Sequence, residues 1–158
     1  MNWHLSNRFD PRALPLADRH YNRQKPGTPQ FVPPGRCLVL LTEDAGALWV
    51  TSWPFAEYTK HAWAGAWVNS LFRRESGHLA SELILQAVAA TMWRWPDIPE
   101  LGMITFVNAA KVESENPGYC YEMAGFKRVG FSRGGLLTYQ MLPDEMPEPE
   151  APMAQALV

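Results

Sequence analysis

One segment of the chain combines a short helix, a glycine stop and the start of a strand: Tyr119-Cys120-Tyr121-Glu122-Met123-Ala124-Gly125-Phe126-Lys127-Arg128-Val129-Gly130. Tyr121, Met123 and Ala124 supply the apolar face of the predicted helix, and Gly125 stands where a left-handed residue ends a helix. An extended run follows from Phe126 to Phe131, and another covers residues 136–142 after a pair of glycines. The segment therefore predicts a short helix that leads directly into a β-hairpin.

The composition is typical of a packed globular chain. Its 158 residues predict a single domain, and 47% hydrophobic against 19% charged residues argues against disorder. No run of about 18 apolar residues is present and the first residues lack an apolar signal core, so we expect a cytoplasmic protein without a membrane span. The two cysteines, Cys37 and Cys120, make no disulfide framework, which fits a reducing compartment.

The net charge of −2 is unevenly distributed along the chain. Residues 1–36 carry six Lys/Arg and two Asp, whereas residues 144–158 carry four acids and no base. This distribution indicates an anionic partner that approaches the basic end. The alternative is that charged ends only keep the chain soluble. The six bases are Arg8, Arg12, Arg19, Arg23, Lys25 and Arg36.

Three regions follow from these patterns. Residues 1–35 form a basic, proline-rich arm with one short helix, which begins near Pro11. Residues 36–142 form the core of the domain. Residues 143–158 form an acidic, proline-rich tail that we expect to be disordered.

The core alternates between strand and helix patterns. The expected elements are strands at 37–42, 48–53 and 62–72, a helix from 79 to about 95, a strand at 103–107, the short helix and the final hairpin. A strand–helix–strand unit makes its two strands parallel, whereas hairpins make theirs antiparallel. The order therefore predicts an α/β (α+β) fold with one mixed central sheet and helices on both faces.

The motif Tyr-Glu-x-x-Gly-Phe-x-x-x-Gly, which starts at Tyr121, resembles the closing segment of GNAT-fold acyltransferases. In that family the last helix presents a tyrosine to the reaction centre, and the order of elements agrees over roughly residues 36–142. The resemblance implies an acetyl-CoA loop of the pattern Arg/Gln-x-x-Gly-x-Gly/Ala before the long helix. Its candidates here are Arg73, Arg74 and Gly77, but Leu79 replaces the small residue and Glu75 adds a negative charge. These departures argue against ordinary use of acetyl-CoA.

A second resemblance accounts for the altered loop. The motif His20-Tyr21-Asn22-Arg23, in a basic arm ahead of a degenerate GNAT-like core, is similar to phage Mom-type DNA adenine modification proteins. That resemblance implies a polar residue on the strand before the long helix, where Asn69 stands in place of arginine, and an acid after the next strand, where Asn108 replaces aspartate. The candidate catalytic residues by this resemblance are His20, Tyr21, Ser81, Asn108 and Tyr121.

The Mom-type resemblance implies carbamoylmethylation of the exocyclic amine of adenine in double-stranded DNA, an anti-restriction activity in a phage-infected or prophage-carrying bacterial cell. The base would leave the duplex and stack on Tyr21 or Tyr121. Asparagine cannot act as a general base, so His20 is the remaining base, or a metal ligand with Tyr21. Iron is implied by the family alone. Phosphates would contact Arg19, Arg23, Lys25 and Arg36.

Two other functions fit the same sequence. One is a conventional acetyl-CoA-dependent N-acetyltransferase acting on a small amine. The other is a non-enzymatic DNA-binding module on an inactive GNAT-like scaffold. Because GNAT-like domains often pair through sheet edges, the resemblance also implies a possible homodimer. The candidate residues also have structural interpretations: Tyr121 as a core aromatic residue, Ser81 as a first-turn serine and His20 as a surface histidine.

Overall fold

The computed structural model describes the chain except for residues 21–22, 24–25, 112–116 and 155–158. The described residues form one seven-stranded mixed sheet in the order β1-β2-β3-β4-β5-β7-β6, in which β4 and β5 are parallel and all other neighbours are antiparallel. This confirms the predicted mixed α+β class. The elements are β1 (Trp3–Leu5), α1 (Leu14–Asp18), β2 (Arg36–Thr42), β3 (Ala47–Trp53), η1 (Ala56–Tyr58), β4 (Trp67–Arg74), α2 (Ala80–Arg94), β5 (Met103–Val107), α3 (Tyr119–Met123), β6 (Lys127–Phe131), β7 (Leu137–Met141) and η2 (Pro143–Glu145).

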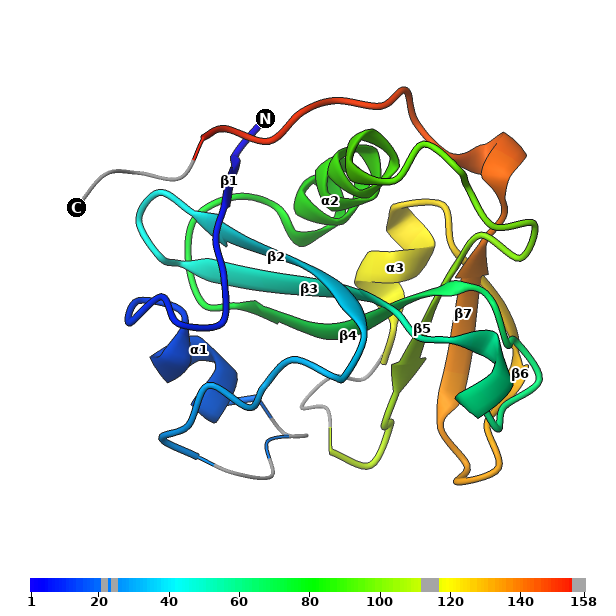
Figure 1. Ribbon diagram of the computed structural model, residues 1–158. Coiled ribbons are helices and arrows are strands. Elements are labelled where there is room, and N and C mark those ends of the chain that lie inside the picture. The colour runs from blue at the N-terminus through cyan, green and yellow to red at the C-terminus, as the bar shows by residue number, and fades with distance from the viewer. Residues whose placement is uncertain (21–22, 24–25, 112–116, 155–158) are drawn as a thin grey trace.

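Helices cover both faces of the sheet, as the element order predicted. Figure 1 shows α2 and α3 on one face and α1 on the other. The helix α2 places Leu83, Ile84 and Val88 in the larger core, where they pack with strand residues such as Trp49 and Trp67. On the other face, α1 contributes the buried side chains of Leu16 and Ala17 to a second core. Burying a large apolar side chain contributes about 1.5–3 kcal/mol, so these two layers hold the sheet in place.

The arm adds a strand that its sequence did not reveal. Trp3 in β1 is fully buried and donates its indole N–H to the carbonyl of Leu83 in α2 at 2.8 Å. The strand pairs antiparallel with β2 over three residues, from Trp3 opposite Thr42 to Leu5 opposite Leu40. A strand this short has no readable alternation, so only its contacts identify it.

The acidic tail is docked as far as residue 154, so the expectation of disorder is wrong for that part. Its backbone pairs with β1, because Met153 donates its N–H to Trp3 O at 2.8 Å and accepts from Leu5 N–H at 2.9 Å. Glu150 N–H also donates to Ala89 O on α2 at 3.1 Å. The tail therefore covers the outward face of α2, where small residues let a backbone approach closely.

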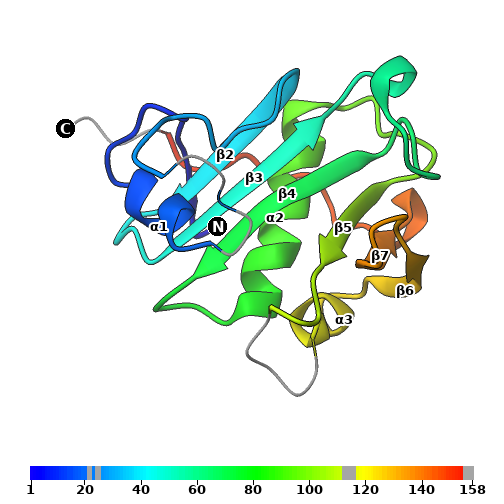
Figure 2. The ribbon, with the colours of Figure 1, turned by 90° about the horizontal axis from the view of Figure 1, so that it is seen from below.

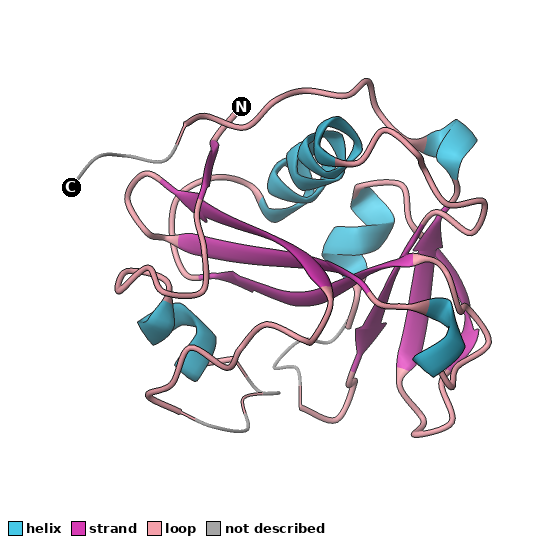
Figure 3. Cartoon of the chain, viewed as in Figure 1, coloured by secondary structure: helices cyan, strands magenta, loops and turns pink. Residues whose placement is uncertain are grey.

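The third strand begins later than the sequence indicated. Residues 62–66 form turns, with a hydrogen bond from Ala66 N–H to Trp63 O at 3.1 Å, and β4 runs on to Arg74. Figure 3 shows this segment as a loop that leads into the strand. In the described part of the chain no helix is long and apolar enough to cross a membrane.

The predicted glycine stop after the short helix is confirmed. Gly125 has φ of 104°, its N–H donates to Glu122 O at 3.0 Å, and Phe126 N–H donates to Tyr121 O at 2.9 Å. These two bonds are the Schellman arrangement that ends a helix at a left-handed glycine. Met123 was expected on the buried apolar face, but its side chain is exposed. Of the predicted face, Tyr121 and Ala124 are buried.

Candidate functional site

The parallel strands β4 and β5 separate halfway along their length. Their pairing runs from Trp67 opposite Met103 to Asn69 opposite Thr105, although both strands continue beyond that point. On its other edge β4 changes register against β3, which leaves Ser70 as an extra residue. Such a bulge bends a strand and increases its twist. The bend therefore coincides with the point where β4 leaves β5, and it opens the sheet there.

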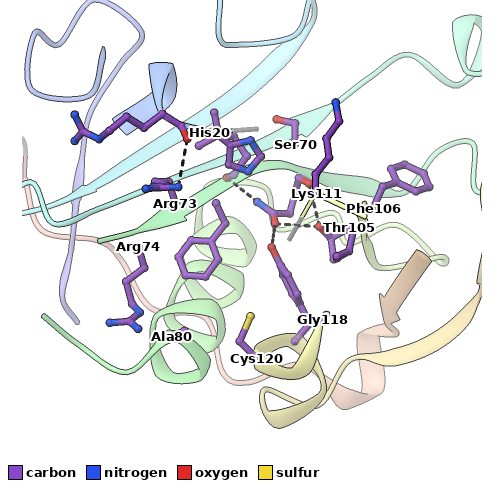
Figure 4. A pocket seen from close by; sticks show the side chains of 16 residues that line it. His20, Ser70, Arg73, Arg74, Ala80, Thr105, Phe106, Lys111, Gly118 and Cys120 are labelled. Carbon is purple, nitrogen blue, oxygen red and sulfur yellow. Dashed lines mark hydrogen bonds between the residues drawn. The ribbon is translucent and has the colours of Figure 1, made fainter. Parts of the chain in front are cut away.

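A cavity of about 580 Å³ lies at this opening (Figure 4). It is lined from both faces of the sheet, since Arg19 and His20 follow α1, whereas Ala80 and Cys120 belong to α2 and α3. Figure 2, seen from below, shows α1 on the near face and α2 behind the strands. The cavity is thus bordered by elements from both faces of the sheet. The other lining residues are Asn69, Ser70, Leu71, Phe72, Arg73, Arg74, Thr105, Phe106, Val107, Lys111, Gly118 and Tyr121.

The floor of the cavity is a buried, neutral hydrogen-bond network of Asn69, Thr105 and Tyr121. The Asn69 carboxamide nitrogen donates to the carbonyls of Val50 at 3.1 Å and Leu71 at 2.9 Å. Its oxygen accepts from the Tyr121 hydroxyl at 2.6 Å and from the Thr105 hydroxyl at 3.1 Å. All four hydrogen-bonding positions of the amide are therefore used. Asn69 is 4% exposed, and it fixes both the bulge in β4 and the position of the Tyr121 hydroxyl.

Aromatic contacts hold the ring of Tyr121 in one orientation. It stacks on Tyr139 with 6.3 Å between ring centroids, and it meets Phe72 and Phe126 edge-on at 6.3 and 5.5 Å. These geometries are those that aromatic pairs prefer. The short helix and its glycine stop therefore present the hydroxyl to the cavity on a rigid support.

The rim of the cavity is exposed and charged, and we define it as Arg19, Arg73 and Glu75. The Glu75 carboxylate accepts from Arg19 Nε and Nη2, both at 2.5 Å, and from Arg73 Nε at 3.0 Å. These guanidinium groups, Arg19 first, hold the pKa of Glu75 below its ordinary value of 4.5. Arg73 Nη1 also donates to the Arg19 carbonyl at 3.3 Å, which ties the turn after α1 to β4.

The predicted phosphate contacts are scattered rather than gathered. Arg23 is turned into the chain, where its side chain is 4% exposed and pairs with Asp18 at 2.7 Å. Arg36, the first residue of β2, lies over the ring of Trp53 at 3.9 Å and does not line the cavity. Arg19 lines the cavity. Tyr21 and Lys25 lie outside the described residues.

The residues predicted to bind the cofactor are divided in the same way. Arg73 and Arg74 line the cavity, but Gly77 does not. The loop that holds Gly77 packs on the β2–β3 turn, because Glu75 N–H donates to Gly46 O at 2.7 Å. The glycine itself has φ of 88°, so its role is to turn the chain before α2.

Two further candidates lie beside the cavity without lining it. Ser81 is the second residue of α2 and follows the lining residue Ala80. Asn108 follows the lining residue Val107, and its side-chain oxygen accepts the Ala110 N–H at 3.1 Å, which forms a local turn. Of the described candidates, His20 and Tyr121 thus line the same cavity, whereas Ser81 and Asn108 are only sequence neighbours of lining residues.

The structure adds residues that the sequence reading missed. Thr105 stands in the apolar run Met103–Val107, and a lone hydroxyl in a buried strand was the available signal. Phe106 and Lys111 line the cavity from the β5 side, and Cys120 lines it from α3. Burial raises the pKa of the Cys120 thiol, so the thiol stays protonated at neutral pH.

The described residues do not offer a ligand set for the iron that the resemblance implied. Among them, no group of three or more His, Cys, Asp or Glu side chains could hold a metal ion. The lining around His20 contains arginine, lysine, hydroxyl and amide groups, which together disfavour the binding of a divalent cation. We therefore derive no chemical step through iron.

Comparison of the chain with protein-family models, with curated proteins and with solved structures finds no match. The geometry of the cavity is therefore the basis for the function proposed below.

Proposed function

We propose that this chain is a transferase of GNAT-like fold that modifies the exocyclic amine of adenine in DNA, by carbamoylmethylation of the Mom type. One observation carries the proposal: a single cavity, at the point where β4 leaves β5, is lined by His20 from the basic arm and by Tyr121 from the closing helix. Those residues come from the two segments on which the resemblances rest. Its volume of about 580 Å³ is within the usual range of ligand pockets and has room for a nucleobase beside a donor group.

The cavity supports an acid–base assignment for the transfer. The adenine, flipped out of the duplex, enters on the side of α1, and its amine attacks the electrophilic carbon of the donor. His20 accepts the proton that the amine nitrogen loses. The leaving group departs with the bonding electrons and takes a proton from Tyr121, whose hydroxyl turns from Asn69 toward it.

Arginine and lysine side chains around the cavity favour a substrate that carries phosphates. Arg19, Arg73, Arg74 and Lys111 all line it, whereas no carboxylate is among the lining residues that the structure describes. Cationic surfaces bind the DNA backbone without reading its sequence, and this affinity falls steeply with salt.

The experiment that tests this function is nucleoside mass spectrometry of DNA from cells that express the chain. We expect a modified adenosine in the wild type, an unchanged nucleoside profile with His20→Ala, and DNA that resists restriction enzymes only in the wild type. Unmodified adenine in the wild type, with His20→Ala behaving identically, would contradict the proposal.

A second candidate is an acetyl-CoA-dependent N-acetyltransferase, which one observation favours. The first turn of α2 lies at the cavity through Ala80, no side chain caps its N-terminus, and Arg74 stands nearby. Free N–H groups at a helix N-terminus bind phosphate well. Tight binding of acetyl-CoA by calorimetry, together with acetylation of small amines and unmodified DNA, would favour this candidate. The inactive DNA-binding module instead predicts salt-sensitive DNA binding without any product.

A further inference from the structure

The carboxylate of Glu75 lies at the point where two guanidinium groups converge. We propose that Arg19 and Arg73 form a binding site for a phosphate oxyanion and that Glu75 occupies this site until a phosphate displaces it. The site itself follows from geometry alone, while its assignment to the phosphodiester backbone of DNA rests on the proposed function.

The contacts of Glu75 are those that an oxyanion would make. Arg19 donates through both Nε and Nη2, one to each carboxylate oxygen at 2.5 Å, and Arg73 Nε donates to one of the same oxygens at 3.0 Å. A guanidinium fork matches carboxylate and phosphate oxygens equally well, because both present two acceptors at similar spacing. A phosphate has further oxygens for the neighbouring Arg74.

A ligand can replace the Glu75 carboxylate in its ion pairs with Arg19 and Arg73. The side chains of Arg19, Arg73 and Glu75 are 52%, 38% and 26% exposed, and exposed ion pairs contribute little to stability. Exchange requires only that the Glu75 side chain rotate, since its backbone N–H stays bonded to Gly46 O at 2.7 Å. The two arginines line the cavity and Glu75 does not, so a phosphate in the cavity reaches both cations.

The arginine pair also keeps its shape without the carboxylate. Arg73 Nη1 donates a hydrogen bond to the carbonyl of Arg19 at 3.3 Å. The helix α1, which precedes Arg19, is anchored by its own core. Among the described residues Asp18 is a second acid that acts on Arg19, but it already accepts hydrogen bonds from Arg23 Nε and from Gly27 N–H. Glu75 is therefore the carboxylate that competes with a phosphate here, and removing its charge should strengthen binding.

The test compares Glu75→Gln with Glu82→Gln, which removes the same charge from an exposed first-turn residue of α2. Binding of a fluorescent duplex oligonucleotide is followed by anisotropy, and binding of coenzyme A by calorimetry, both at low salt. We expect Glu75→Gln to bind one of these probes about threefold to tenfold more tightly than wild type, and Glu82→Gln to stay within about twofold. Arg19→Ala and Arg73→Ala should each weaken the same binding.

A gain with the duplex identifies the ligand as the DNA backbone, and a gain with coenzyme A identifies it as the phosphates of a small-molecule donor. Weaker binding of both probes by Glu75→Gln would overturn the inference, because it would mean that Glu75 only holds the arm in place. An equal gain in Glu82→Gln would overturn it as well, since it would reflect net charge alone. Neither readout requires turnover, so loss of the proposed activity leaves this result independent.

Discussion

The floor and the rim of the cavity differ in burial, in charge and in what their hydrogen bonds hold together. The floor, Asn69 with Thr105 and Tyr121, is buried and neutral, and its bonds join three strands and a helix. The rim, Arg19 with Arg73 and Glu75, is exposed and charged, and its bonds join a turn to the end of one strand. A buried amide without partners is costly, whereas an exposed ion pair is nearly neutral in free energy. Changes in the floor should therefore lower the free energy of unfolding, and changes in the rim should alter what the protein binds.

Removing the central amide of the floor should have the largest effect on stability. Asn69→Ala leaves the carbonyls of Val50 and Leu71 without their side-chain donor in the core, so we expect the free energy of unfolding to fall by about 3 kcal/mol. Urea denaturation measures the loss. The matched control is Asn108→Ala, which removes the side-chain acceptor of the Ala110 N–H in a turn and should cost about 1 kcal/mol or less. Equal losses in both variants would mean that the floor is not a structural centre.

Removing only the phenol oxygen separates the chemistry of the floor from its stability. Tyr121→Phe keeps the aromatic contacts with Tyr139 and Phe126 but loses the 2.6 Å hydrogen bond to Asn69, so we expect a loss of about 1–1.5 kcal/mol. Formation of the modified nucleoside should fall at least about 100-fold, the usual contribution of a general acid. Tyr139→Phe is the control, because its hydroxyl bonds to Pro117 O at 3.0 Å and does not line the cavity. Full activity in Tyr121→Phe would remove this tyrosine from the mechanism.

Changes in the rim should affect the stability of the fold least, and their main effect should be on the pKa of Glu75. Arg19 lowers the pKa of Glu75, so the pair stabilises the fold above about pH 4.5 and loses that contribution as the pH falls through the lowered pKa. Arg19→Ala should move the pKa of Glu75 back toward 4.5, measured by NMR of the side-chain carboxyl carbons. Arg12→Ala should instead raise the pKa of Asp10 and leave Glu75 unchanged, because Arg12 is the main partner of Asp10. An unshifted Glu75 in Arg19→Ala would show that the two groups do not pair in solution.

Local signals in the sequence predicted most of the fold. Gly125 predicted the end of α3, because the left-handed backbone conformation that ends the helix is unfavourable for any residue with a side chain. The helical spacing from Leu79 predicted α2 to within a residue or two of its observed bounds, Ala80–Arg94. The docked tail was missed because it bonds to backbone groups of Trp3, Leu5 and Ala89, and backbone groups give no sign in the sequence of what pairs with them.

Only part of the candidate site could be predicted from the sequence, because its contacts join residues that are far apart in the chain. Tyr121 came from a resemblance, but its bond to Asn69 spans 52 positions in the chain, and the bond of Arg19 to Glu75 spans 56. No periodicity of helices or strands encodes such separations, because they depend on how strands are ordered in the sheet. Arg23 shows the converse: its basic neighbours suggested a phosphate contact, while the fold gives it Asp18 as a partner.

The central claim is that this cavity receives a base of bound DNA, and the two cysteines allow a direct test of it. Cys120 lines the cavity, whereas Cys37 lies in β2 with its thiol bonded to Pro33 O at 3.3 Å, and burial raises the pKa of Cys37 to about 11. Alkylation of each thiol at mildly alkaline pH is followed by mass spectrometry, with and without a saturating DNA duplex. We predict that the duplex slows alkylation of Cys120 by about fivefold or more and leaves Cys37 within about twofold. Alkylation of Cys120 at an unchanged rate while the duplex is bound would contradict the claim.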